Sequence, residues 1–569
     1  MNQIVTAPRF AWGTLGLVSL GSLALFLWPG VGWWLLLLAL LPALLRLLAR
    51  QRPWPPTPGT GLLLLFLVTA VLATLIAYNP DLAWAKFRLL AAASLLYLAL
   101  AGQPYENRWP LAGGATMIGA LLAGYFLLGG SALLPAKLAA DLSIICLPFA
   151  VAIGARGWLA RNWLMVAGAT GAILLTLLAL LVNDSRGALV APIVALGVWA
   201  LWPVAGWLAR RLRQPAPLLY GGLLLLGGLG GLFLVVAVIG GFGHLLTIFG
   251  GPVGASGRYD IWIGLFHLLR DFRFSGSGLA TFPGLYAQYI LVIPFYFVGH
   301  GHNLLGDVAL EQGAVAALLL LAIYGRSGWA LVRMGRQAAG DSAAETSLRW
   351  AAGASLLIVL LHGLVDDPLY GELGTPFLFF APGMALLVSG PAWHGLSGDW
   401  RWPLAVATAI FAALAGLLWI SRPIPAAWAA NRGAVQMAQT ELADWPLDRW
   451  AVGEYAAALA PLQAQFTAAA QADPGNVTAQ YRLGLLAMGR WEWETAVFHL
   501  QIAHQAAPTH RGVRKNLGYS AVWSGNFEQA ASLLADIPET QAEMAAYVHW
   551  WQQQGRPDLA EQAAIMTRQ

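Results

Sequence analysis

Three side chains suited to binding phosphate and moving a proton stand out in a chain with few charged residues: Arg186, Arg258 and His302. The planar guanidinium group of arginine binds phosphate oxygens through paired hydrogen bonds, and an imidazole accepts a proton near neutral pH. The plainer interpretation is that arginines at span ends reach lipid headgroups and that a lone histidine there is structural. His302 is favoured as a base because it follows a long loop and is followed by polar side chains, with His300 as the alternative. Together these residues predict a site where a phosphate-bearing substrate meets a proton acceptor.

Two polar residues, Asn303 and Glu311, lie on the helix that we expect to follow His302. Ionisable groups inside a membrane bundle need a partner. Glu311 could therefore face the bundle interior and orient His302, or it could pair with an arginine there. The first interpretation makes Glu311 a supporting residue of the predicted site, and the second gives it a structural role only.

Two further pairs of charged residues are candidates for supporting roles. Asp366 and Asp367, in the sequence HGLVDDPLY, could bind acceptor hydroxyls or fix Arg258, and a simple solvated turn is the alternative. Lys86 and Arg88 could add positive potential where an anionic lipid enters. Their alternative role is to reach the headgroups as a pair at the end of a span.

The composition is that of an integral membrane protein. Of the 569 residues, 58% are hydrophobic and 10% are charged, against roughly 25% charged residues in soluble domains. The formal charge of +5 is dispersed among apolar segments, so a membrane explains it better than nucleic-acid binding does. The single cysteine excludes an intrachain disulfide and a cysteine metal cluster. Because the predicted outer loops also lack an Asp-x-Asp cluster, we predict metal-independent chemistry without a cofactor.

Thirteen apolar segments are candidates to cross the bilayer, since about 20 helical residues span a hydrocarbon core of about 30 Å. They are 11–28, 31–49, 61–78, 87–102, 111–130, 140–155, 162–182, 187–206, 218–241, 303–325, 348–365, 374–391 and 403–421. The first is predicted to be retained rather than cleaved as a signal peptide, because a second apolar segment follows at once. Most arginines fall in the loops of one side, which places the N-terminus in the cytoplasm and the loop 242–302 outside. An odd number of spans then places the C-terminal region outside as well.

A second, more polar domain is predicted to follow the membrane domain (residues 1–421) and to cover residues 422–569. Within it, several residues recur 34 positions apart: Pro474 with Pro508, Leu483 with Leu517, and Gly484 with Gly518. This period and these small residues resemble tetratricopeptide repeats, in which helical hairpins stack and bury a shared face. Flanking helices from 427–470 and 538–566 are expected to cap the stack. Such repeats commonly bind peptides, so we expect this domain to bind a partner protein or the acceptor.

The order of several motifs resembles one family of membrane enzymes. The motifs are Ser185-Arg186-Gly187, Gly257-Arg258 with Ile261-Trp262, SGSGLATF, His302-Asn303 with Glu311 and Gly313, and HGLVDDPLY. Over roughly residues 60–391 they resemble the O-antigen ligase and polymerase superfamily of bacterial membrane glycosyltransferases, which includes protein O-oligosaccharyltransferases. The ligase pattern expects glycine, threonine or tyrosine where this chain has Ala316.

The resemblance implies an all-α, polytopic helical fold of the GT-C-like kind in the bacterial cytoplasmic (inner) membrane, with a periplasmic C-terminal domain. It implies that Arg186 and Arg258 hold the diphosphate of an undecaprenyl-diphosphate-linked glycan, and that His302 activates the acceptor hydroxyl. Single displacement from an α-linked donor would invert the anomeric centre. Three acceptors remain open: a lipid A-core, a second lipid-linked glycan, as in a polymerase, or a protein hydroxyl.

Two readings from other functional classes compete with the enzyme. A transporter or flippase could use the arginines to guide an anionic lipid-linked glycan, although the spans show no convincing duplication such as many transporters have. A membrane-anchored scaffold would need only residues 422–569.

Overall fold

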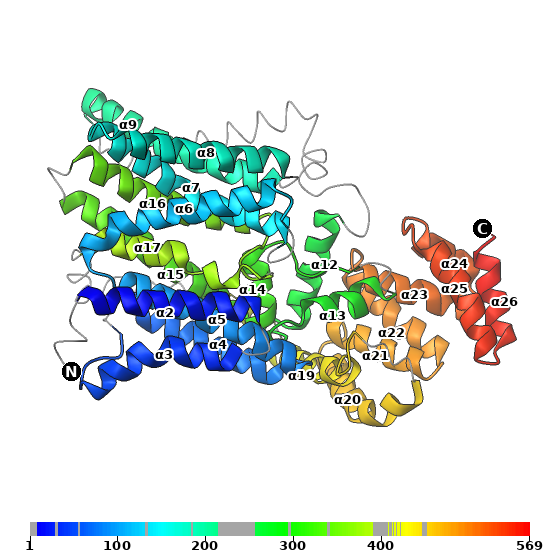
Figure 1. The fold of residues 1–569 in the computed structure, drawn as a ribbon. Coiled ribbons are helices and arrows are strands. Elements are labelled where there is room, and N and C mark those ends of the chain that lie inside the picture. The colour runs from blue at the N-terminus through cyan, green and yellow to red at the C-terminus, as the bar shows by residue number, and fades with distance from the viewer. Residues whose placement is uncertain are drawn as a thin grey trace.

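The computed structural model describes residues 8–28, 32–54, 57–130, 135–183, 186–213, 223, 257–293, 297–337, 342–371, 373–390, 408, 412, 415–416, 418–421, 423–446 and 452–568. Among these residues all regular secondary structure is helical, which confirms the predicted all-α class. The helices form three groups along the length of the molecule: a large bundle, a short middle group and the C-terminal helices (Figure 1).

The bundle contains the helices that are apolar enough to meet lipid. They are α2 (Pro8–Leu27), α3 (Gly32–Leu48), α4 (Thr60–Ile76), α5 (Pro80–Ala101), α6 (Arg108–Leu127), α7 (Ala136–Leu159), α8 (Trp163–Val182), α9 (Arg186–Leu212), α15 (Ala314–Gln337), α16 (Ala343–Gly363) and α17 (Phe380–Ser389). Within the described residues, six helices are long and apolar enough to cross a membrane, and five further apolar helices are shorter. Each overlaps a predicted span, and the predicted spans 218–241 and 403–421 lie largely outside the described residues.

One predicted span, 303–325, is divided in two at Gly313. Residues before it form the short helix α14 (Leu304–Gln312), and the apolar span begins at Ala314. Gly313 has a φ of +87°, which favours glycine. The N–H groups of Ser277 and Gly278 donate to the carbonyls of Leu310 and Glu311 at 2.7 and 3.0 Å. In a continuous helix these carbonyls would accept from N–H groups one turn further along the same helix. Here they accept from a distant loop instead, so the helix can end at this point.

Small side chains let the central helices approach closely. Gly119 of α6 faces Cys146 of α7, where an added Cβ would come within 2.7 Å of the cysteine Cβ. Close approach through small residues is the usual way in which helices associate in a membrane. On the outside of the bundle, α8 exposes large apolar side chains, among them Leu174, Leu178 and Leu181, as a lipid-facing helix would.

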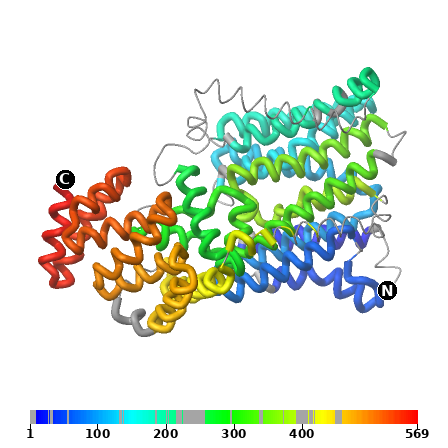
Figure 2. Tube along the Cα trace, turned by 180° about the vertical axis from the view of Figure 1, so that it is seen from behind, coloured from blue at the N-terminus to red at the C-terminus, as the bar shows by residue number. Residues whose placement is uncertain are grey.

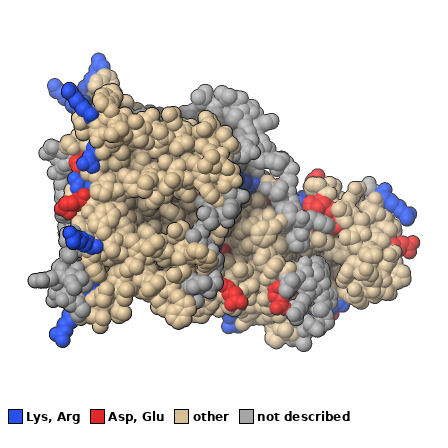
Figure 3. Space-filling model, in the orientation of Figure 1, with Lys and Arg blue, Asp and Glu red and all other residues tan. Residues whose placement is uncertain are grey.

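Lys and Arg side chains gather at the end of the bundle farthest from the C-terminal helices (Figure 3). Basic residues occupy the last turns of α3, α7 and α9, namely Arg46, Arg156, Arg210 and Arg211. This is the distribution that membrane proteins show on their cytoplasmic side. The predicted orientation, with the C-terminal helices outside, stays a prediction that agrees with this distribution.

The middle group comes from the described part of the predicted outer loop. It comprises α12 (Arg258–Asp271), α13 (Phe282–Tyr286) and the π-helical turn η3 (Ala287–Leu291). Both views place it between the bundle and the C-terminal helices (Figures 1 and 2).

The C-terminal helices are arranged as antiparallel pairs. They are α19 (Ile424–Glu441), α20 (Val452–Ala472), α21 (Val477–Gly489), α22 (Trp493–Ala506), α23 (Arg511–Trp523), α24 (Phe527–Leu534), α25 (Thr540–Gln553) and α26 (Pro557–Met566). The hairpins α21–α22 and α23–α24 coincide with the two predicted repeat units. An added Cβ on Gly484 would lie 2.5 Å from Leu500, and one on Gly518 would lie 2.6 Å from Leu534. The same close helix contact therefore recurs in both hairpins, although their assignment as tetratricopeptide repeats stays a prediction.

The C-terminal helices share a hydrophobic core with the middle group. Tyr289, Leu265 and Leu268 of the middle group are buried in one cluster with Tyr481 and Leu517 of the hairpins. The predicted domain boundary near residue 422 stays a prediction, and apolar packing continues across it.

Candidate functional site

One carboxylate joins two of the three residues singled out from the sequence. Asp366 Oδ2 accepts from Arg258 Nη2 at 2.7 Å, and Asp366 Oδ1 lies 2.8 Å from His302 Nδ1. The Asp366 side chain is 4% exposed, whereas those of Arg258 and His302 are 19% and 23% exposed. The buried carboxylate thus holds a guanidinium and an imidazole that both remain accessible to a substrate.

Helix α12 positions Arg258 because Arg258 is its first residue, after Gly257 as the N-cap. One turn further on, Trp262 Nε1 donates to the carbonyl of His302 at 3.2 Å. Residues four apart lie on one helix face. A single face of α12 therefore contacts both the carboxylate partner and the backbone of the candidate base.

His302 has an unusual backbone conformation, with a φ of +51°. Few residues other than glycine adopt this region, and histidine is among those that adopt it more readily. The N–H of His302 donates to Nδ1 of His300 at 3.2 Å, so that nitrogen of His300 acts as an acceptor. Strained conformations of this kind persist where the surroundings hold them and are common at functional sites.

The hydrogen bonds also assign the tautomer of His302. An ionised carboxylate can only accept, so His302 Nδ1 carries the proton that it shares with Asp366, and Nε2 keeps its lone pair. Burial of the ring lowers the pKa of His302 below its usual value, an effect that His300 and Arg258 reinforce and Asp366 opposes. The imidazole is therefore neutral at pH 7 and able to accept a proton at Nε2.

His300, the alternative base, is buried to 6% exposure. Its ring centroid lies 4.1 Å from that of His302, and its side chain packs against Gly371, where an added Cβ would come within 2.5 Å of His300 Cβ. Of the two histidines, the more accessible His302 is the better placed to meet an acceptor.

Asn303 has a structural role at the start of α14. Its Oδ1 accepts from the N–H of Gly306 at 2.8 Å and caps the helix, while its Nδ2 donates to the carbonyl of Leu364 at 2.9 Å. Asn303 therefore joins the segment that carries His302 to the turn that carries Asp366.

Glu311 pairs with Lys86 rather than with His302. Glu311 Oε2 lies 2.7 Å from Lys86 Nζ, and the ammonium of Lys86 lies 3.9 Å from the centroid of the Tyr370 ring. Of the two interpretations of Glu311, pairing with a cation agrees with this contact, but the cation is Lys86 and not an arginine. Arg88 does not appear in this pair, although it has other interactions.

The two aspartates of HGLVDDPLY face different surroundings. Asp366 holds Arg258 and His302, whereas Asp367 is fully buried and accepts from the N–H of Tyr370 at 2.8 Å. Burial raises the pKa of Asp367, opposed in part by His300 and Lys86. Asp367 therefore stabilises the backbone of the turn 366–370 through a buried hydrogen bond.

Arg186 is the first residue of α9, and its side chain lies outside the described residues. The position of its neighbour Gly187 is described. An added Cβ on Gly187 would lie 2.6 Å from Val365 and 3.2 Å from His362, both within four residues of Asp366. The start of α9 therefore lies against the turn that holds Arg258 and His302.

Two residues near this turn were not singled out from the sequence: Asp141 of α7 and His362 of α16. Asp141 accepts from Asn183 Nδ2 at 3.1 Å, just before α9. The donor atoms of Asp141, His362 and Asp366 lie within 4.8 Å of one another, as do those of His300, His302 and Asp366. Imidazole and carboxylate are donors that divalent cations use. His362 could have been noticed because it opens HGLVDDPLY, whereas Asp141 lies in an apolar stretch that gives no such signal.

This arrangement defines a class of protein: an all-α, polytopic membrane protein with an arginine, a histidine and a buried carboxylate gathered beside the first residue of a membrane helix. The O-antigen ligase family model matches residues 171–321 of the chain, which confirms the predicted resemblance to the O-antigen ligase superfamily. The matched segment contains Arg186, Arg258 and His302 and ends before Asp366. No curated protein matches the chain.

Proposed function

We propose that the protein is a membrane glycosyltransferase that moves a glycan from undecaprenyl diphosphate to an acceptor hydroxyl at the outer face of the bacterial cytoplasmic membrane. The family match supports a glycosyltransferase of the O-antigen ligase and polymerase type. The observation that carries the specific proposal is the carboxylate of Asp366, which bridges Arg258 and His302.

Arg258 binds the donor diphosphate in this proposal. Its guanidinium group has five N–H donors, and the bond to Asp366 uses Nη2. The other donors meet the phosphate oxygens, and Arg186, at the start of α9, contributes a second guanidinium. As the bond between the anomeric carbon and the diphosphate breaks, negative charge grows on the leaving oxygens. Positioned cations stabilise that charge strongly in a site with little water.

His302 takes the proton of the acceptor in the same step. The acceptor oxygen attacks the anomeric carbon as the diphosphate leaves, and the hydroxyl proton moves to Nε2. Asp366 remains an ion, fixes the tautomer of the ring and stabilises the imidazolium that forms. The products are the glycosylated acceptor and undecaprenyl diphosphate. A single displacement of this kind inverts the anomeric configuration, and no metal takes part.

The experiment uses purified full-length protein with undecaprenyl-diphosphate-linked glycan and three acceptors in parallel: lipid A-core, a second lipid-linked glycan and a protein. Each arm is run with and without EDTA, and transfer is measured by the mass of the product. We expect transfer in one arm, unchanged by EDTA, and its loss in Arg186→Ala, Arg258→Ala and His302→Ala.

A matched control replaces an exposed arginine on the C-terminal helices, Arg556→Ala, and should transfer at the wild-type rate. Wild-type rates in Arg258→Ala and His302→Ala would refute the proposed site. Loss of activity with EDTA would refute metal independence and point to the donor atoms around Asp366. Movement of the lipid-linked glycan across vesicles without transfer would instead indicate a transporter.

A further inference from the structure

Helices α21 and α23, each the first helix of one of the two predicted repeat hairpins, contact the middle group through a set of mostly polar residues that we call the docking face. The docking face consists of Thr478, Tyr481, Arg482, Gly512, Lys515 and Asn516. It meets two backbone carbonyls of η3: Tyr481 Oη donates to the carbonyl of Tyr289 at 2.9 Å, and Lys515 Nζ donates to that of Leu291 at 2.5 Å. An added Cβ on Gly512 would collide with the same Tyr289 carbonyl. These two helices therefore bind a segment of the protein's own chain.

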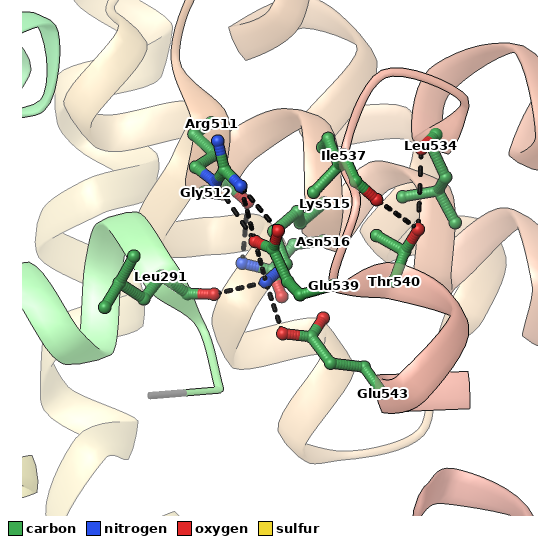
Figure 4. A network of polar contacts seen from close by, with 10 residues as sticks. All are labelled: Leu291, Arg511, Gly512, Lys515, Asn516, Leu534, Ile537, Glu539, Thr540 and Glu543. Atoms are coloured by element: carbon green, nitrogen blue, oxygen red, sulfur yellow. Dashed lines mark hydrogen bonds and ion pairs between the residues drawn. The ribbon is translucent and has the colours of Figure 1, made fainter. Parts of the chain in front are cut away.

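A buried network of charges fixes this contact (Figure 4). The Lys515 side chain has no exposed surface, and its Nζ lies 2.6 Å from Glu543 and 3.3 Å from Glu539. Glu539 also pairs with Arg511 at 2.6 Å. Buried charges are costly unless their partners are placed correctly, so such a network favours one geometry over loosely docked alternatives.

A second buried ion pair holds the last residue of α12. Arg482 Nη2 lies 3.0 Å from Asp271 Oδ2, and the two side chains are 0% and 2% exposed. Thr478 Oγ1 donates to the other oxygen of Asp271 at 2.6 Å. The Arg482 guanidinium carbon also lies 3.3 Å from the centroid of the Tyr289 ring. One arginine of the docking face thus holds α12 and η3 together.

Helix α12 connects this ion pair to the candidate functional site. Its 14 residues begin at Arg258 and end at Asp271, a length of about 20 Å at 1.5 Å per residue. Its middle is held as well, since the ring of His267 stacks on that of His510 at 4.5 Å between centroids. Gly264 packs so closely on Tyr286 that an added Cβ would lie 2.6 Å from the ring. A helix restrained along its whole length transmits the position of one end to the other.

We infer that the docking face binds the chain's own middle group and that Arg482 is a positioning residue, which holds α12 so that Arg258 and Trp262 stay in place at the site. This inference rests on the proposed function for its kinetic consequence. Its structural consequence, the restraint of α12, can be measured without any activity.

The structural test is hydrogen exchange of the full-length protein, with Arg482→Met as the variant. Breaking a buried ion pair by removing one partner leaves the other charge unpaired. We expect the amides of α12 and η3 to exchange at least about tenfold faster, because local opening becomes easier, while those of α8 are unchanged. Arg490→Met, which removes an exposed pair with Glu492 on the same hairpin, is the matched control and should leave exchange unaltered.

The kinetic test compares the same variants in the transfer assay. We expect Arg482→Met to raise KM for the lipid-linked donor about tenfold and to leave KM for the acceptor unchanged, because it displaces Arg258, which binds the donor. Thr478→Val, which removes one hydrogen bond to Asp271 but keeps the ion pair, should change exchange and donor KM in the same direction and by less. This second variant keeps the test decisive if Arg482→Met fails to fold.

The two tests separate the two proposals. Unchanged exchange in α12 would overturn the inference, and so would faster exchange with an unchanged donor KM. Absence of transfer by the wild-type protein would overturn the proposed function, and the exchange measurement would then decide alone whether the docking face restrains α12.

Discussion

Replacing Asp366 with asparagine tests the reasoning about the site most directly. The amide keeps the shape of the carboxylate but has one acceptor oxygen in place of two. Arg258 Nη2 and His302 Nδ1 both point donors at this side chain, at 2.7 and 2.8 Å. The amide oxygen can face only one of them, so its NH₂ group must oppose the other donor. If it opposes His302, the ring loses the partner that sets its tautomer; if it opposes Arg258, the arginine loses its anchor.

The magnitude follows from what the base supplies. General base catalysis contributes about 10²- to 10⁴-fold, so Asp366→Asn should lower kcat by about that factor. Asp558→Asn, at an exposed aspartate of the C-terminal helices, serves as the control. Transfer by Asp366→Asn within about twofold of wild type would refute the role given to the bridging carboxylate.

Three further predictions follow from other parts of the structure. Because burial lowers the pKa of His302, kcat/KM should persist below the ordinary histidine value of 6.5 and fall only as the pH drops through the lowered pKa, which a pH–rate profile measures. Gly187→Val should reduce transfer at least about tenfold by overpacking the turn. Gly168→Val on α8 is the control and should leave transfer unchanged, because nothing lies within 4 Å of an added Cβ there. Equal activity of the two variants would contradict the placement of α9. Burial, reinforced by the nearby His267 and Arg482, holds the pKa of His510 well below 6.5, so the unfolded chain takes up the proton first and stability is lost as the pH falls below about 6.5. Thermal unfolding between about pH 5 and 7.5 should show this loss in the wild type and a weaker one in His510→Phe.

Much of the fold could be predicted because apolar segments about 20 residues long have few alternatives to a membrane helix. The pairing of Arg258 with Asp366 was also among the expected contacts, since a buried carboxylate near an arginine tends to meet it. The shared role of Asp366 was not predicted, because nothing in the order of the sequence indicates that one carboxylate reaches both Arg258 and His302.

The features that sequence reasoning missed all depend on distant parts of the chain. The division at Gly313 depends on N–H groups of residues 277 and 278, which satisfy the end of α14 from outside the helix. The partner of Glu311 is Lys86, from a helix far earlier in the chain. The 34-residue period predicted helical hairpins, but only the folded arrangement shows that Tyr481 and Lys515 of those hairpins bond to η3.

The number of residues in α12 fixes both the distance and the relative rotation between Arg258 and Asp271. Each residue of a helix turns it by about 100° and advances it by 1.5 Å. Inserting or deleting one residue between Arg258 and Asp271 would rotate one end away from its partner, and the ion pairs Arg258–Asp366 and Arg482–Asp271 could not both form. Natural variants of this protein should therefore tolerate substitutions on the exposed side of α12, at Tyr259 or Phe266, far more readily than any change in its number of residues.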